Sequence, residues 1–144
     1  MFRKLVATPP LWLTIPLRLA LGIIFIAHGG GKMFGWFGGR GLSVFIEGTP
    51  PFGFMRPSWL WLGAAAFAEF FGGLLVLAGL LTRFGAFLIL CVMLTAMLGV
   101  HWGTFFMPRG IEFTLALLAI AVALIISGGG RVSVDELLMR GKRR

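Results

Sequence analysis

The sequence predicts an all-α membrane protein, built as an antiparallel bundle of four transmembrane helices. Three observations lead to this prediction: 58% of the 144 residues are hydrophobic, only 12% are charged, and the apolar residues gather in long runs. A soluble domain of this size carries about 25% charged residues, because much of its surface faces water. The composition therefore excludes a soluble enzyme, a nucleic-acid-binding protein and a disordered chain.

Four apolar stretches are expected to cross the membrane, at about residues 11–33, 59–81, 83–102 and 111–127. An α-helix needs about 20 residues to cross the hydrocarbon core. Pro16 is tolerated in a first helical turn, so the regular part of the first helix is expected to begin near it. Little more than Thr82 and Arg83 separates the second stretch from the third, so these two helices must be antiparallel neighbours. We expect a single domain over residues 1–144.

The segments outside these stretches predict two short helices. Residues 34–58 are rich in glycine and proline, and we expect a loop there around one short interfacial helix near 42–47. After the fourth stretch, the run 127–130 (Ser-Gly-Gly-Gly) ends the helix. Ser133 followed by Glu136 has the form of a capping box, which predicts a short cytoplasmic helix over about 134–140.

The distribution of basic residues predicts the orientation. With both termini on one side, that side carries Arg3, Lys4, Arg83, Arg131, Arg140, Lys142, Arg143 and Arg144. The other side carries Lys32, Arg40, Arg56 and Arg109. The positive-inside rule therefore places both termini in the cytoplasm. Contact with anionic lipid explains the net charge of +8 without a nucleic-acid partner.

Ionisable side chains inside the predicted spans are the candidate functional residues, because each costs roughly 2.5–3.5 kcal/mol to insert. The candidates for ligand binding or proton relay are His28, Lys32, Glu69, His101 and Glu112. His28 and Lys32 share one helix face, and each of the four helices brings at least one polar group toward the outer half of the bundle. This convergence predicts a polar site there.

Each candidate also has a plainer interpretation. Glu69 is either neutral or clamped in a structural ion pair with His28, Lys32 or Arg18. Glu112 serves equally well as a charge at a helix N-terminus, and His101 as an interfacial histidine. Near the cytoplasmic end, Arg18 and Arg83 are expected to reach lipid headgroups, and Arg18 alternatively a carboxylate.

Five short motifs follow one another along the chain. They are Leu17-Arg18-Leu19-x-Leu21-Gly22, His28-Gly29-x-x-Lys32, Ala68-Glu69-x-x-Gly72-Gly73-x-Leu75, Gly79-x-x-Thr82-Arg83 and Gly130-Arg131-x-Ser133-x-Asp135, with His101 and Glu112 before the last. In order and spacing they resemble the DoxX family of small bacterial membrane proteins. The resemblance covers nearly the whole chain. It implies a four-helix, multi-pass protein of the bacterial inner membrane, whose relatives are associated with membrane oxidoreductase complexes and with thiol or oxidative-stress defence.

Two functions follow as hypotheses. The first is a redox-associated subunit that binds a quinone or another small apolar ligand, with His28 or Lys32 donating a hydrogen bond and Glu69 relaying protons. A partner protein of redox or oxidative-stress function is then expected. The second is a membrane scaffold without enzymatic activity, or a small transporter that works as a homo-oligomer. Whether the chain is an enzyme stays open.

Haem or metal binding is a third alternative. Haem ligation would use His28 and His101, and a metal site would add Glu112. Cys91 is the single cysteine, so a disulfide within the chain, a CxxC redox pair and a multi-cysteine metal centre are excluded.

Overall fold

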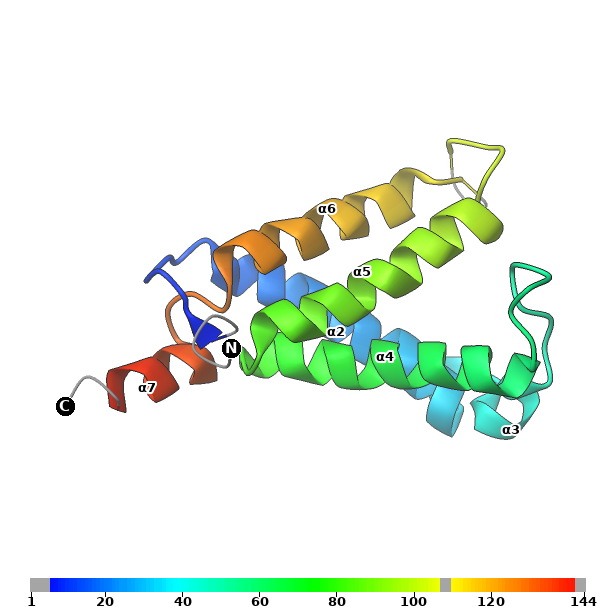
Figure 1. Cartoon of the computed structure of the whole chain (residues 1–144), viewed down its shortest axis with the longest axis horizontal. Helices are drawn as coiled ribbons and strands as arrows, with labels where there is room; N and C mark the ends of the chain where they lie inside the picture. The colour runs from blue at the N-terminus through cyan, green and yellow to red at the C-terminus, as the bar shows by residue number, and fades with distance from the viewer. Residues whose placement is uncertain (1–5, 107–109, 142–144) are drawn as a thin grey trace.

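The computed structural model describes residues 6–106 and 110–141, and the regular structure within these ranges is entirely helical (Figure 1). The elements are α2 (Thr14–Phe34), η1 (Trp36–Gly38), α3 (Gly41–Ile46), α4 (Ser58–Ala78), α5 (Thr82–Gly99), α6 (Glu112–Ser127) and α7 (Val134–Gly141). The predicted all-α class is confirmed for the described residues. The terminal basic residues used for the orientation (Arg3, Lys4, Lys142, Arg143, Arg144) and Arg109 lie outside these ranges.

Three of the helices, α2, α4 and α5, are long and apolar enough to cross a membrane. Their outward faces carry exposed apolar side chains such as Ile23, Phe67 and Phe87, where a soluble bundle would place polar ones. The fourth expected span appears as α6, an apolar helix of 16 residues. At 1.5 Å per residue this helix is about 24 Å long, shorter than the roughly 30 Å of hydrocarbon.

Each long helix packs mainly against the next long helix along the chain: α2 against α4, α4 against α5, and α5 against α6. Figure 1 shows α4 and α5 diverging from their shared turn toward the end that carries α3, and α6 running back along α5. The core between them is formed by fully buried side chains, among them Leu21, Phe25, Val76, Ile89 and Leu124. α2 also contacts α6, less extensively than the helices that follow one another along the chain contact each other.

Glycines allow the close approach of α2 to α4. A Cβ added to Gly29 would lie 2.6 Å from the Phe70 Cα, and one added to Gly73 would lie 2.8 Å from the Ile26 backbone nitrogen. Neither distance is possible without moving the backbone. Small residues at such positions let two helices pack backbone to backbone in lipid, where no hydrophobic force drives them together.

The turn between α4 and α5 is held by a side chain from α7. Gly79 ends α4 in a left-handed conformation with φ 67, as Gly35 ends α2 with φ 77. Asp135 then accepts hydrogen bonds from the backbone nitrogens of Leu81 and Thr82, at 2.8 and 3.0 Å, and from the Thr82 hydroxyl at 2.8 Å. The two backbone donors are among the free N–H groups that every helix N-terminus exposes. Asp135 therefore caps α5 from the far end of the sequence.

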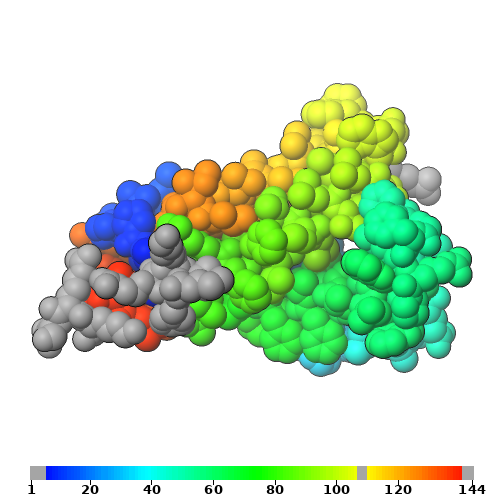
Figure 2. Space-filling view, viewed as in Figure 1, coloured from blue at the N-terminus to red at the C-terminus, as the bar shows by residue number. Residues whose placement is uncertain are grey.

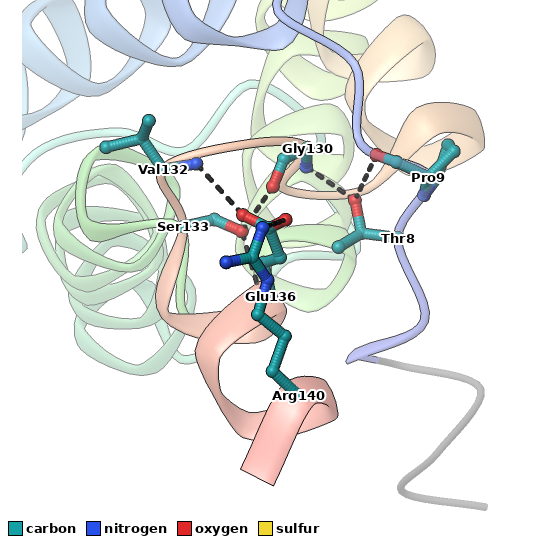
Figure 3. A network of polar contacts seen from close by, with 7 residues as sticks. All are labelled: Thr8, Pro9, Gly130, Val132, Ser133, Glu136 and Arg140. Carbon is teal, nitrogen blue, oxygen red and sulfur yellow. Dashed lines mark hydrogen bonds and ion pairs between the residues drawn. The ribbon is translucent and has the colours of Figure 1, made fainter. Parts of the chain in front are cut away.

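The Ser133 cap predicted before α7 is confirmed, and the Glu136 carboxylate reaches back one residue further than in a standard capping box (Figure 3). The Glu136 backbone nitrogen donates to the Ser133 hydroxyl at 3.1 Å, and the Val132 nitrogen donates to the Glu136 carboxylate at 3.2 Å. The same network ties in the N-terminal segment, because Gly130 N donates to the Thr8 hydroxyl. The resulting helix α7 covers the predicted 134–140 region and extends to Gly141.

The long connection between α2 and α4 contains η1 and α3, and α3 confirms the short helix expected near residues 42–47. Figures 1 and 2 show this connection at one end of the molecule and α7 at the other. The candidate site lies toward the α3 end, where α2 and α5 terminate.

Candidate functional site

A pocket of about 340 Å³ lies among α2, α4, α5 and α6, in the half of the bundle toward α3. Its apolar lining comes from Phe25, Met93, Ala96, Phe113 and Leu117. Its polar lining comes from His28, Lys32, Glu69, His101 and Thr114. The pocket thus brings together four of the five residues selected from the sequence. A small number of polar groups in an apolar pocket of this size is the usual composition of a small-molecule site.

Glu69 is the most deeply buried ionisable group of the pocket, with 2% of the side chain exposed. It lies in the middle of α4, on the face that packs against α2. The Lys32 ammonium, on the last turn of α2, donates a hydrogen bond to Glu69 Oε1 and forms an ion pair with it. Of the three cations considered as partners of Glu69, the structure therefore selects Lys32.

The second carboxylate oxygen of Glu69 has a different environment. Among the described residues, Oε2 is buried and has no hydrogen-bond partner. A buried carboxylate oxygen without a donor is unfavourable by about 1–3 kcal/mol or more, and such atoms are rare in folded proteins. The pocket therefore offers one strong, unused hydrogen-bond acceptor.

The two histidines reach the pocket from different elements. His28 lies one helical turn before Lys32 on α2, is exposed, and has its ring centroid 6.4 Å from that of Phe25. His101 follows the end of α5, where its backbone nitrogen donates to Ala96 O at 3.0 Å, and its side chain is half-buried. Both lie on the pocket wall with the Lys32–Glu69 pair.

Glu112 differs from the expectation that it lines the same site. It is the first residue of α6, and the lining comes instead from Gly110, Phe113 and Thr114 around it. A helix turns by about 100° per residue, so the side chains of neighbouring residues point in different directions. Thr114 was not selected from the sequence, because a helical threonine that donates to its own backbone, here Ile111 O at 2.8 Å, is an ordinary feature.

Arg18 is buried, with only 5% of its surface exposed, and it forms no ion pair with Glu69. Its Nε donates to Val76 O at 3.1 Å and its Nη2 to Leu77 O at 2.8 Å, both on the last turn of α4. Its Nη1 donates to the carbonyls of Gly129 and Val132, both at 3.1 Å. The guanidinium therefore caps α4 and fixes the loop before α7. This position differs from the lipid-anchoring and carboxylate-pairing roles considered for it.

Arg83 is half-buried at the start of α5, and its Nη2 donates to Ile126 O at 3.1 Å, near the C-terminus of α6. A cation there interacts favourably with the helix dipole. Among the described residues, no group of three His, Cys, Asp or Glu side chains is placed to hold a metal ion, and this includes the set of His28, His101 and Glu112.

Comparisons with known proteins agree with the fold. The sequence model of the DoxX family matches residues 13–102. A curated protein of Bacillus subtilis (strain 168), named "Putative oxidoreductase CatD", is 32% identical over 132 residues, which cover 90% of each chain. No solved structure matches significantly. The family match spans α2 to α5 and therefore includes the Lys32–Glu69 pair.

Proposed function

The chain belongs to the DoxX family, and we propose that it is a redox-associated subunit of the bacterial inner membrane that binds a quinone-like or other small apolar ligand. The ligand occupies the pocket of about 340 Å³ around Glu69. The relative named as an oxidoreductase supports a redox context.

The proposal includes α6 as the fourth transmembrane helix, with both termini in the cytoplasm. Leu115, Val122 and Ile126 of α6 are exposed apolar side chains on a helix packed against α5. A short span is accommodated by local thinning of the bilayer, at a modest cost per ångström of mismatch. The eight basic residues on the cytoplasmic side against four on the other support the orientation.

The observation that carries the proposal is the unpartnered Oε2 of Glu69. A carboxylate oxygen in an apolar pocket favours a ligand with a hydrogen-bond donor, and a hydroquinone hydroxyl is such a donor. Lys32 holds the opposite oxygen and keeps the carboxylate oriented. Glu69 is then placed to bind the hydroxyl and to accept its proton.

The other lining residues complete the recognition. His28 and His101 supply imidazole nitrogens that donate to a quinone carbonyl, while Phe25, Met93 and Phe113 contact an apolar ring. Because His28 is exposed, it is also placed to pass a proton between the pocket and the outside. Electrons are exchanged between the ligand and a partner protein of the membrane.

The proposal is tested by gentle purification of the full-length protein, followed by mass spectrometry for co-purifying quinones and by titration of the delipidated protein in nanodiscs with a short-chain quinone and its quinol. We expect saturable binding. An absence of both a co-purified quinone and saturable binding of either form would contradict the proposal.

A further inference from the structure

A second and larger cavity, of about 480 Å³, lies between the end of α2 and the segment that contains η1 and α3. We call it the outer cavity. Its principal side chains are His28, Lys32 and Arg40, together with the rings of Trp36, Phe37 and Phe45. The pocket around Glu69 shares only His28 and Lys32 with it, so the two spaces lie on either side of the last turns of α2.

The charge of the outer cavity is one-sided. Among the described residues, its lining contains two cationic side chains and a histidine, and no carboxylate. Within the described part of the chain, Lys32 is paired with Glu69 across the wall, whereas Arg40 is exposed and forms no ion pair. A guanidinium with free donors beside an ammonium is a combination that favours phosphate-type oxyanions.

The backbone of the outer cavity is built tightly. A Cβ added to Gly39 would collide with the backbone of Gly31, so η1 folds directly onto α2. Phe37 adopts a left-handed conformation with φ 55 and is 89% exposed. A bulky residue rarely takes this conformation unless the surrounding structure fixes it, and such strain is concentrated at functional segments.

We propose that the outer cavity binds a phosphate-type oxyanion, held by Arg40 and Lys32, with the aromatic rings contacting the organic part of the molecule. The oxyanion comes either from the headgroup of an anionic phospholipid or from a soluble phosphate. The site uses a cavity other than the one in the proposed function, so oxyanion binding is measurable without a quinone.

The shared lysine couples the two sites. Lys32 Nζ donates to Glu69 and also lies 5.3 Å from the centroid of the Phe45 ring, which lines the outer cavity. An oxyanion in the outer cavity draws the ammonium away from Glu69 and weakens the ion pair. The bound oxyanion thereby changes the affinity of Glu69 for its ligand. By linkage, a ligand on Glu69 changes the affinity for the oxyanion by the same factor.

The test uses the full-length protein in phosphatidylcholine nanodiscs, with Arg40→Gln as the variant and Arg56→Gln as the matched control. Arg56 is also an exposed arginine of the α2–α4 connection, but it is absent from the cavity lining. Inorganic phosphate is titrated by calorimetry, and phosphatidylglycerol retained by the purified protein is counted by native mass spectrometry. We expect Arg40→Gln to weaken binding about ten-fold or more, and Arg56→Gln to change it less than about two-fold.

The two probes distinguish the sources. Arg40-dependent binding of inorganic phosphate identifies a soluble anion, and Arg40-dependent retention of phosphatidylglycerol alone identifies a lipid headgroup. If Arg40→Gln does not fold, Arg40→Lys keeps the charge without the planar fork and is expected to weaken binding measurably. The proposal is overturned if neither probe binds, or if the Arg40 variant that folds binds no more weakly than Arg56→Gln.

Discussion

Lys32 on α2 donates a hydrogen bond to Glu69 on α4, and the ion pair joins these two helices at the wall between the pocket and the outer cavity. The pair leaves one Glu69 oxygen without a donor among the described residues. It therefore contributes to stability while keeping an acceptor available for a ligand. The predictions below separate these two contributions.

Glu69→Ala is expected to lower the free energy of unfolding in detergent by about 1–3 kcal/mol, because it removes the partner of a partly buried ammonium. Glu112→Ala is the matched control. Glu112 is half-buried in the first turn of α6, where a carboxylate contributes about 0.3–1 kcal/mol through the helix dipole. Chemical denaturation followed by circular dichroism measures both, and equal small losses would mean that the pair does not stabilise the bundle.

Arg18→Lys is expected to lower the free energy of unfolding by about 2–4 kcal/mol. Four backbone carbonyls accept hydrogen bonds from the guanidinium, and an ammonium has only three donors and no planar fork. Arg83→Lys, which loses one hydrogen bond to Ile126 O, should cost less than about 1 kcal/mol. Thermal unfolding of both variants in the same detergent makes the comparison, and a similar loss in each would contradict the capping role of Arg18.

Asp135→Ala is expected to destabilise the start of α5 by about 1–2 kcal/mol, because three hydrogen bonds to Leu81 and Thr82 are lost. Hydrogen exchange measures the effect locally: amide protection should fall at residues 81–85 and in α7. Glu136→Ala is the control on the same helix: it removes bonds to Val132 N and Arg140, so it is expected to lower protection in α7 and to leave residues 81–85 unchanged. Unchanged protection at residues 81–85 in Asp135→Ala would exclude this cap.

Gly29→Ala is expected to separate α2 from α4, because the new methyl group would meet the backbone of Phe70. We expect a loss of about 1–3 kcal/mol from overpacking. Gly53→Ala is the control, since a Cβ there meets nothing within 4 Å. The unfolding midpoints of the two variants give the comparison, and a Gly29 variant as stable as the Gly53 variant would contradict the close packing of α2 against α4.

The sequence predicted the helices because their signals are local. Long apolar runs gave α2, α4 and α5, and the spacing of Ser133 and Glu136 gave the start of α7. The expected second span ran to residue 81, whereas α4 ends at Ala78 and Gly79 caps it. Residues 79–81 form the turn instead, which no periodicity of apolar residues can reveal.

The candidate site was predictable in its members and not in its geometry. The selection rested only on the free-energy cost of placing an ionisable side chain in a membrane span. It identified His28, Lys32, Glu69 and His101. Three cations were possible partners of Glu69, and only the packing of α2 on α4 distinguishes Lys32 from Arg18. The surroundings of Arg18 were not predictable, because Gly129 and Val132 are more than 100 positions away in the chain.

The outer cavity was also not predictable. It depends on the left-handed conformation of Phe37 and on the contact of Gly39 with Gly31. Sequence patterns do not indicate either feature, because a phenylalanine rarely adopts a positive φ.

The most direct measurement is the affinity of a short-chain quinol for Glu69→Gln, in nanodiscs, against Glu47→Gln as a control with an exposed carboxylate outside the pocket. Glutamine keeps the size of Glu69 but replaces the carboxylate that binds the hydroxyl. We expect Glu69→Gln to bind the quinol at least about ten-fold more weakly than the wild-type protein, and Glu47→Gln to bind it with unchanged affinity. Equal affinities in the wild-type protein and both variants would show that Glu69 does not bind the ligand.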